Sequence, residues 1–405
     1  MFGAIETSAR LFDDLYDEEK INRILNYNYS LILVDEMFPV YQLPMVQKLQ
    51  QKWGSQVMSF GTTEYYSTYA EYRGMSRSFV TSPSFYVKIS LLTLHYQHFV
   101  SKVVSALEYI STHIEPYHSW WRGRHVASVL NSTYDLKKYY DTNAWTFVDF
   151  PDHIFLPQTT YAFSSNVAST CPTTTATLEE DDFKKFIEDP KSKGTIYIAF
   201  GSLIAWELAP PHVIPIFIEA IKHFPDYNFI WSIKLEGLNV SMSNVKITKW
   251  APQPAILSHP KTLLFISHAG MKSLKESLCS ETPVLFMPFF ADQPRNVYEC
   301  LRLGIGEYID KTNLKSEAII SNMNKILSNH SEYAAKVKKT KSFFIDRIMN
   351  QSEEAIFIVN KFLKLGTNHF KSQIKGANQS YLVRLYLDFF ILLIVVVFFL
   401  SMDKV

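Results

Sequence analysis

Residues 250–297, WAPQPAILSHPKTLLFISHAGMKSLKESLCSETPVLFMPFFADQPRNV, decide the fold class. The apolar runs at 263–267 and 283–288 have the length and composition of buried strands. A helix-length segment at 270–279 lies between them, and another follows Asp292. A strand, a helix and a second strand in this order predict a βαβ unit within a parallel sheet.

The same alternation continues on the N-terminal side of this stretch. Apolar runs at 195–200, 228–233 and 245–248 predict three more strands, and prolines 210 and 211 open a helix between the first two. Earlier in the chain, runs at 31–34 and 55–60 flank a helical segment at 40–52. Because 405 residues exceed the roughly 250–300 that one core holds, the sequence predicts an α/β protein of two Rossmann-type lobes.

Polar and aromatic residues follow the strands of the second lobe, at the edge where doubly wound sheets bind ligands. His268 and Gly270 stand where a strand turns into a helix, which offers free backbone N–H groups to an anion. Trp250 presents a flat apolar face to a base. These features predict a nucleotide-sugar or related dinucleotide-like ligand. The candidate binding residues are Ser202, Trp250, Gln253, His268, Gly270, Ser273, Glu276, Asp292 and Gln293.

Single residues of this set also have a structural interpretation. Trp250 is typical of a core, His268 of a strand-end histidine with satisfied hydrogen bonds, and Asp292 of a helix N-cap. The convergence of four strand ends on one edge favours the binding site over these alternatives.

Several protein classes are excluded by motif and composition. No GxGxxG follows a strand, and GxxxxGK[ST], HExxH and GxSxG do not occur, which removes the main support for dehydrogenases, P-loop proteins, zincins and hydrolases. A formal net charge of +1 gives no reason to expect a nucleic-acid partner. Three widely spaced cysteines exclude a CxxC metal clamp and allow at most one disulfide.

The stretch 250–297, with AFGS at 199–202 and VDEMFP at 34–39, resembles the donor-binding signature of the animal UDP-glycosyltransferases, the UDP-glucuronosyltransferase family. The resemblance implies a GT-B fold with an acceptor lobe first and a UDP-sugar lobe second. It implies no metal and no cofactor beyond UDP-sugar as co-substrate, because backbone amides and a helix end stabilise the leaving UDP. The implied roles are uracil stacking for Trp250, ribose or base contact for Gln253, ribose contact for Glu276, diphosphate binding for His268, Gly270, Ser202 and Ser273, and sugar contact for Asp292 and Gln293.

The resemblance also implies a catalytic site with departures from the family pattern. Asp35 matches the carboxylate that orients the family's catalytic His, but no His precedes His95 in this sequence. We therefore expect an N-terminally incomplete first lobe. In the donor loop the family's His-Gly-Gly-x-Asn-Ser becomes HAGMKS at 268–273, and Glu281 stands where the family usually has Gly. The methyl group of Ala269 is expected to cause strain where φ is positive.

The C-terminal residues 381–402 predict one transmembrane helix, with a buried core helix as the alternative. Six N-x-[ST] sequons favour a lumenal body, whereas the basic residues before the span favour a cytoplasmic one, and the N-terminus shows no signal peptide. The resemblance implies a type I endoplasmic-reticulum membrane protein with its body in the lumen. The predicted segments are a partial acceptor lobe (1–165), a linker (166–193), a donor lobe (194–345), a C-terminal helix and juxtamembrane segment (346–380), the transmembrane helix (381–402) and a tail (403–405).

Together, the residues and the resemblance predict a membrane-bound, inverting UDP-glycosyltransferase. It moves a glucuronosyl or glucosyl group from UDP-glucuronic acid or UDP-glucose to a hydroxyl of a small lipophilic acceptor, as a single chain or as a homo- or hetero-oligomer with related transferases. The alternative is a non-catalytic family member that binds UDP-sugar or partner transferases, because the catalytic His is absent.

Overall fold

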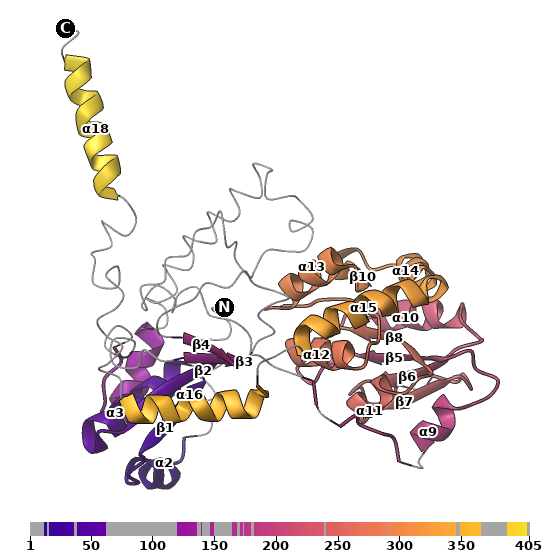
Figure 1. The fold of residues 1–405 in the computed structure, drawn as a ribbon, viewed down its shortest axis with the longest axis horizontal. Helices are drawn as coiled ribbons and strands as arrows, with labels where there is room; N and C mark the ends of the chain where they lie inside the picture. The colour runs from indigo at the N-terminus through magenta and orange to yellow at the C-terminus, as the bar shows by residue number, and fades with distance from the viewer. Residues whose placement is uncertain are drawn as a thin grey trace.

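The computed structural model describes residues 12–13, 16–35, 39–61, 120–135, 139, 146–149, 164–167, 171–172, 174–179, 182–238, 240–290, 292–345, 349–365 and 387–402. Two parallel sheets organise these residues, each with helices packed against it (Figure 1). The stretch 65–121 is rich in Tyr, Phe, Trp and His, a composition that fits either an apolar binding cleft or a core, and it lies almost wholly outside the described residues.

The first sheet has four parallel strands in the order β1-β2-β3-β4. They are β1 (Leu31–Asp35), β2 (Gln56–Gly61), β3 (Thr146–Asp149) and β4 (Ser164–Val167). Helix α3 (Pro39–Trp53) joins β1 to β2 and buries Leu43 and Val46 against Val34 and Val57, and α2 (Glu18–Leu25) precedes β1. The two strands and the helix predicted in this part of the sequence are confirmed.

The second sheet has six parallel strands in the order β10-β9-β8-β5-β6-β7. Every residue of β5 is buried, as expected of a continuous apolar run in a sheet covered on both faces. The strands are β5 (Thr195–Ala199), β6 (Asn228–Ser232), β7 (Val245–Thr248), β8 (Thr262–Ser267), β9 (Val284–Phe286) and β10 (Gly306–Tyr308). The doubly wound sheet predicted from the alternating pattern is confirmed.

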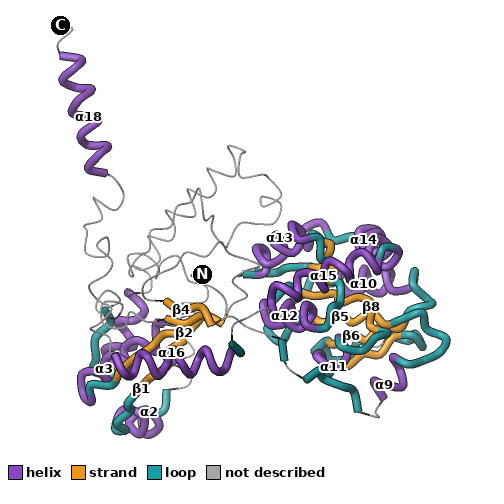
Figure 2. The backbone as a smooth tube through the Cα atoms, in the orientation of Figure 1, coloured by secondary structure: helices purple, strands orange, loops and turns teal. Residues whose placement is uncertain are grey.

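Helices cover both faces of this second sheet (Figure 2). Side chains of β5 alternate between two core clusters: Ile196 and Ile198 pack on one face, Tyr197 and Ala199 on the other. The first face is closed by α10 (Val213–Lys222) and α14 (Ser316–Ser328). The other helices of the lobe are α11 (Gln253–Leu257), α12 (Met271–Cys279), α13 (Gln293–Leu303) and α15 (His330–Ile345), with short 3-10 turns η1 (Trp206–Leu208) and η2 (Lys311–Asn313).

The strand order reverses between β5 and β8, which are neighbours in the sheet although two strands separate them in sequence. In an open α/β sheet, the loops that leave the two strands at such a point diverge to opposite faces and leave a crevice at the carboxyl ends. Because β5 and β8 are neighbouring parallel strands, the loops that follow them begin side by side at the carboxyl edge of the sheet.

The segment 166–193, predicted as a linker, contains regular structure. Strand β4 extends to Val167, and helix α9 (Asp182–Ile187) buries Ile187 in the core of the second lobe. Cys171 forms a disulfide with Cys279 at the end of α12, and Cys300 is a buried free thiol. The polar, charged composition of this segment concealed a short helix with a single buried apolar face, so its second half packs on the donor lobe.

Two helices follow the second lobe. Helix α16 (Gln351–Leu365) lies beside the first sheet and contacts β4 (Figure 1). Helix α18 (Leu387–Met402) is 16 residues long, and no helix within the described residues is long and apolar enough to cross a membrane. Residues 381–386 lie outside the described part of the chain, so the transmembrane helix at 381–402 stays a prediction.

Candidate functional site

The loops after β5 and β8 meet around the imidazole of His268. A Cβ atom added at Gly270 would lie 2.4 Å from His268 Nε2, and one added at Gly201 would lie 2.8 Å from the same atom. The ring is therefore wedged against two backbone segments that only glycine allows at this distance. Its Nδ1 is buried and has no hydrogen-bond partner among the described residues, so the interpretation of His268 as a satisfied strand-end histidine is wrong.

Burial lowers the pKa of His268 from 6.5 to about 4. The ring is consequently neutral at neutral pH, with one nitrogen able to donate a hydrogen bond and the other able to accept one. Gly270 is the N-cap of α12, so the free N–H groups at the start of this helix begin two residues after His268. A neutral donor beside a helix N-terminus suits an anion such as a phosphate.

A second cluster joins α11 to the first turns of α12. Gln253 Nε2 donates to Ser273 Oγ at 3.1 Å and to Glu276 Oε2 at 2.5 Å. Burial raises the pKa of Glu276, and the hydrogen bond from Gln253 opposes that rise. Three of the predicted binding residues thus lie in one hydrogen-bonded group, which presents a carboxylate with its orientation fixed.

Trp250 lies in the turn after β7, and 72% of its surface is exposed. Its backbone is held by Thr248, whose Oγ1 donates to Trp250 O at 2.6 Å. The interpretation of Trp250 as a core residue is therefore wrong. An exposed indole three residues before Gln253 offers the flat face that stacking on a base requires.

The loop after β9 carries Asp292 and Gln293. Gln293 is 5% exposed, and its Oε1 accepts from the N–H groups of Phe289 and Phe290 at 2.8 and 3.1 Å. That oxygen shapes the loop, so only the amide nitrogen of Gln293 is left for a ligand. Asp292 occupies the N-cap position of α13, as the capping interpretation predicts, but its side chain makes no capping hydrogen bond.

The side chain of Asp292 is instead held by Asn296, whose Nδ2 donates to Asp292 Oδ2 at 2.8 Å. The same Nδ2 donates to Ala269 O at 2.9 Å. Asn296 therefore links the loop after β9 to the loop after β8, a role that was not predicted. The sequence signal for it is the spacing of four residues between Asp292 and Asn296 on a helix.

The departures from the family pattern have structural consequences. Ala269 has φ +65° and Glu281 has φ +61°, a conformation that glycine adopts without strain. The expected strain at Ala269 is confirmed. The backbone strain at Glu281 is partly offset by an ion pair of 2.9 Å between its side chain and Lys341 on α15. Lys272 is exposed in the first turn of α12.

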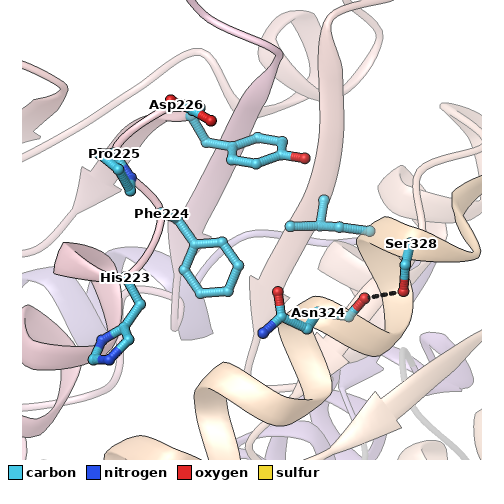
Figure 3. A pocket seen from close by; sticks show the side chains of 8 residues that line it. His223, Phe224, Pro225, Asp226, Asn324 and Ser328 are labelled. Atoms are coloured by element: carbon cyan, nitrogen blue, oxygen red, sulfur yellow. Dashed lines mark hydrogen bonds between the residues drawn. The ribbon is translucent and has the colours of Figure 1, made fainter.

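Two further residues complete the predicted set. Ser202 is exposed and follows Gly201 directly, so it lies next to the His268 wedge. Asp35 lies at the C-terminal end of β1 in the first sheet, the position predicted for it. A cavity of about 310 Å³ lies at the opposite edge of the second sheet, between the C-terminal ends of α10 and α14, where His223, Asp226 and Asn324 line it (Figure 3). It does not belong to the candidate site.

The residues at the carboxyl edge of the second sheet can together hold an anion, a pair of vicinal hydroxyls and a flat ring. His268, between Gly201 and Gly270, and the N-terminus of α12 can donate hydrogen bonds to the anion, and the Gln253–Glu276 group can bind the hydroxyls. Trp250 can stack on the flat ring.

Comparison with known families supports this interpretation. Residues 78–404 match a family model described as UDP-glucoronosyl and UDP-glucosyl transferase. A putative UDP-glucuronosyltransferase of Caenorhabditis elegans, ugt-48, is 32% identical over 194 residues, which are 46% of this chain and 36% of that protein. The UDP-glycosyltransferase UGT4 of Dactylopius coccus is 32% identical over 214 residues, 52% of this chain and 40% of that protein. These alignments span about two fifths of the relatives' lengths or less.

Solved glycosyltransferase structures share the two-lobe fold. Os79 from O. sativa in complex with UDP matches with a TM-score of 0.57 at 14% identity, over 89% of this chain and 82% of that one. The glycotransferase of kitacinnamycin matches with a TM-score of 0.55 at 15% identity, over 82% of this chain and 76% of that one. At such low identity the likeness shows the GT-B fold and nothing finer.

Proposed function

The chain belongs to the UDP-glucuronosyl and UDP-glucosyl transferase family, and on that premise we propose that it is a membrane-bound, inverting transferase of glucuronosyl or glucosyl groups. The donor is UDP-glucuronic acid or UDP-glucose, and the acceptor is a hydroxyl of a small lipophilic compound. The observation that carries the proposal is the meeting of His268, Gly201 and Gly270 at the strand-order reversal, beside the Gln253–Glu276 group.

Each part of a UDP-sugar has a counterpart at this edge. The uracil ring stacks on Trp250, and the ribose hydroxyls donate to Glu276, which Gln253 holds in place. The diphosphate accepts hydrogen bonds from His268 and from the N–H groups at the start of α12, with Ser202 and Ser273 beside them. The sugar hydroxyls face Asp292. The proposal includes no metal ion.

At the anomeric carbon the reaction forms one carbon–oxygen bond and breaks another, and the acceptor oxygen gives up its proton. The acceptor oxygen attacks the anomeric carbon from the side opposite the diphosphate, the carbon–oxygen bond to the diphosphate breaks, and UDP leaves with the electron pair. The acceptor proton passes to a general base; Asp35, at the end of β1, matches the carboxylate that orients this base in the family, and the base itself has no counterpart among the residues of this sequence before His95. Because the N-terminus of α12 and the neutral His268 donate to the diphosphate, they stabilise the charge that develops on departing UDP.

The proposal places the body of the chain in the lumen of the endoplasmic reticulum, anchored by the C-terminal apolar segment. The Cys171–Cys279 disulfide supports an oxidising compartment, because such bonds are rare where thiols are kept reduced. The apolar helix α18 and the sequons support the same placement.

One observation favours a second candidate, a family member that binds UDP-sugar without turnover. Ala269 is fully buried in a left-handed conformation at the turn that leads into α12, and Lys272 replaces an amide of the family pattern. A displaced diphosphate loop would still bind UDP but misalign the anomeric carbon, and such small misplacements cost catalysis heavily.

Product formation distinguishes the two candidates. The full chain in membranes is incubated with UDP-glucuronic acid or UDP-glucose and a panel of phenols and aliphatic alcohols, and products are sought by mass spectrometry. Transfer that is lost in Asp35→Ala supports the transferase. Saturable UDP binding without any product supports the binding protein, and absence of UDP binding contradicts both.

A further inference from the structure

Asn296 is a buried amide in the second turn of α13 and makes two hydrogen bonds away from its own backbone. It is 2% exposed, and its Nδ2 reaches Ala269 O at 2.9 Å and Asp292 Oδ2 at 2.8 Å. Both amide hydrogens of one nitrogen are thus used, one for each loop of the donor site.

The contact with Ala269 acts on a strained peptide. Ala269 has φ +65° and is fully buried, and it lies between His268 and the N-cap Gly270. A non-glycine residue in this region costs about 1–2 kcal/mol, so the conformation persists only where surrounding contacts hold it. The hydrogen bond from Asn296 to the carbonyl of Ala269 is such a contact, and it fixes the peptide from which α12 starts.

The second hydrogen bond of Asn296 holds Asp292, the carboxylate assigned to the sugar. Asp292 makes no capping bond to α13, and the amide of Asn296 donates to one of its carboxylate oxygens. Among the described residues no other side chain donates to Asp292, so Oδ1 is the oxygen left for a ligand, and its direction is set by the bond to Oδ2. The backbone of the same loop is held separately by Gln293, through Phe289 and Phe290.

We propose that Asn296 is a positioning residue that locks the diphosphate loop (residues 267–270) and the sugar-side carboxylate of Asp292 into one unit, so that both halves of a UDP-sugar are held in register. The proposal rests on the proposed function, because it assigns these loops to a UDP-sugar. Asn296 acts through Ala269 and Asp292 and does not itself contact the ligand.

The test is equilibrium binding of UDP and of UDP-glucose to the full chain carrying Asn296→Ala. The control is Asn244→Ala, because Asn244 Nδ2 also donates two hydrogen bonds, to Phe224 O at 3.4 Å and to Tyr227 O at 2.9 Å, at the opposite edge of the sheet. Both variants lose two hydrogen bonds from one amide nitrogen and are expected to unfold at a lower temperature, Asn296→Ala more so because Asn296 is buried and Asn244 is half-buried. UDP affinity falls about tenfold only in Asn296→Ala, the equivalent of about one hydrogen bond.

A second readout separates positioning from a loss of stability. UDP-glucose should lose more affinity than UDP in Asn296→Ala, because Asp292 is misdirected as well as the diphosphate loop. Amide hydrogen exchange should accelerate at 268–273 and 289–293, and in Asn244→Ala it should not. If Asn296→Ala does not fold, Asn296→Ser replaces it, since its hydroxyl takes the place of Cγ and falls short of both acceptors while it keeps a polar group in the buried site.

The outcomes divide cleanly. UDP and UDP-glucose affinities in Asn296→Ala that match those of the Asn244→Ala control, at a temperature where both variants are folded, would show that Asn296 is only structural and overturn the inference. Absence of UDP binding by the unaltered chain would instead contradict the proposed function, and the inference with it.

Discussion

Replacing Gly201 by Ala tests the wedge around His268 with a matched control in the same lobe. Gly201 has φ +76° and Gly237 has φ +74°, so an added methyl meets nearly the same backbone penalty, about 1 kcal/mol, at both sites. At Gly201 the new Cβ would lie 2.8 Å from His268 Nε2 and 2.9 Å from Cε1. At Gly237 no described atom lies within 4 Å of it.

The difference between the two variants isolates the effect of the His268 contact. Overpacking of this kind costs about 1–3 kcal/mol, so Gly201→Ala should lose about 2–4 kcal/mol of unfolding free energy and Gly237→Ala about 1 kcal/mol. Because the methyl pushes the imidazole out of place, UDP affinity should fall about tenfold or more in Gly201→Ala and stay unchanged in Gly237→Ala.

Urea unfolding and calorimetric titration with UDP measure the two quantities on the same preparations. Equal stability losses in the two variants, or unchanged UDP affinity in Gly201→Ala, would refute the claim that the loop after β5 and His268 form one anion site. Loss of UDP affinity in Gly237→Ala would show that the backbone penalty alone disturbs the site.

Three other predictions follow from the site and its departures. Trp250→Ala should weaken UDP binding by about 1–3 kcal/mol, the scale of base stacking on an aromatic ring. Its melting temperature should not fall, because the side chain is 72% exposed. Unchanged UDP affinity would contradict the stacking role. Burial lowers the pKa of His268 to about 4, so the unfolded chain takes up the proton before the folded one as pH drops from 6.5 to 4. This uptake should lower the free energy of unfolding by at most about 3 kcal/mol over that range, and the contribution should be absent in His268→Asn. Identical urea-unfolding pH profiles for the two proteins would contradict the prediction. Glu281→Gly should raise the free energy of unfolding by about 0.5 kcal/mol, because glycine relieves about 1 kcal/mol of backbone strain at φ +61° and the lost ion pair with Lys341 is partly exposed and contributes less. A lower melting temperature of Glu281→Gly would show that the ion pair contributes more than the strain costs.

Five of the six strands of the second sheet were predicted from sequence, and the four central ones are buried almost throughout; the three-residue strand β10 was not predicted. Apolar runs such as 195–199 and 263–267 are too short for typical helices and alternate with helix-length segments, which favours strands, and the residues just after parallel strands share one edge of the sheet. The positions of His268, Gly270 and Trp250 followed from that rule alone.

Other features of the site depend on contacts between residues far apart in the chain, which the sequence pattern does not predict. Gln293 belongs to a recognisable motif, but the use of its oxygen on two backbone amides follows from the path of the loop after β9. The double role of Asn296 requires that α13 pass beside the loop after β8. The pairing of Cys171 with Cys279 required the folded position of the segment before β5.

Titration of the full chain with UDP, UMP and uridine tests the central claim most directly. If the edge formed by Trp250, His268 and the start of α12 holds a uridine diphosphate, UDP binds saturably at one site. Affinity then falls when the terminal phosphate is removed and falls again for uridine, because the helix end and His268 lose their anion. Equal affinity for UDP and uridine, or no saturable binding of UDP, would contradict the account.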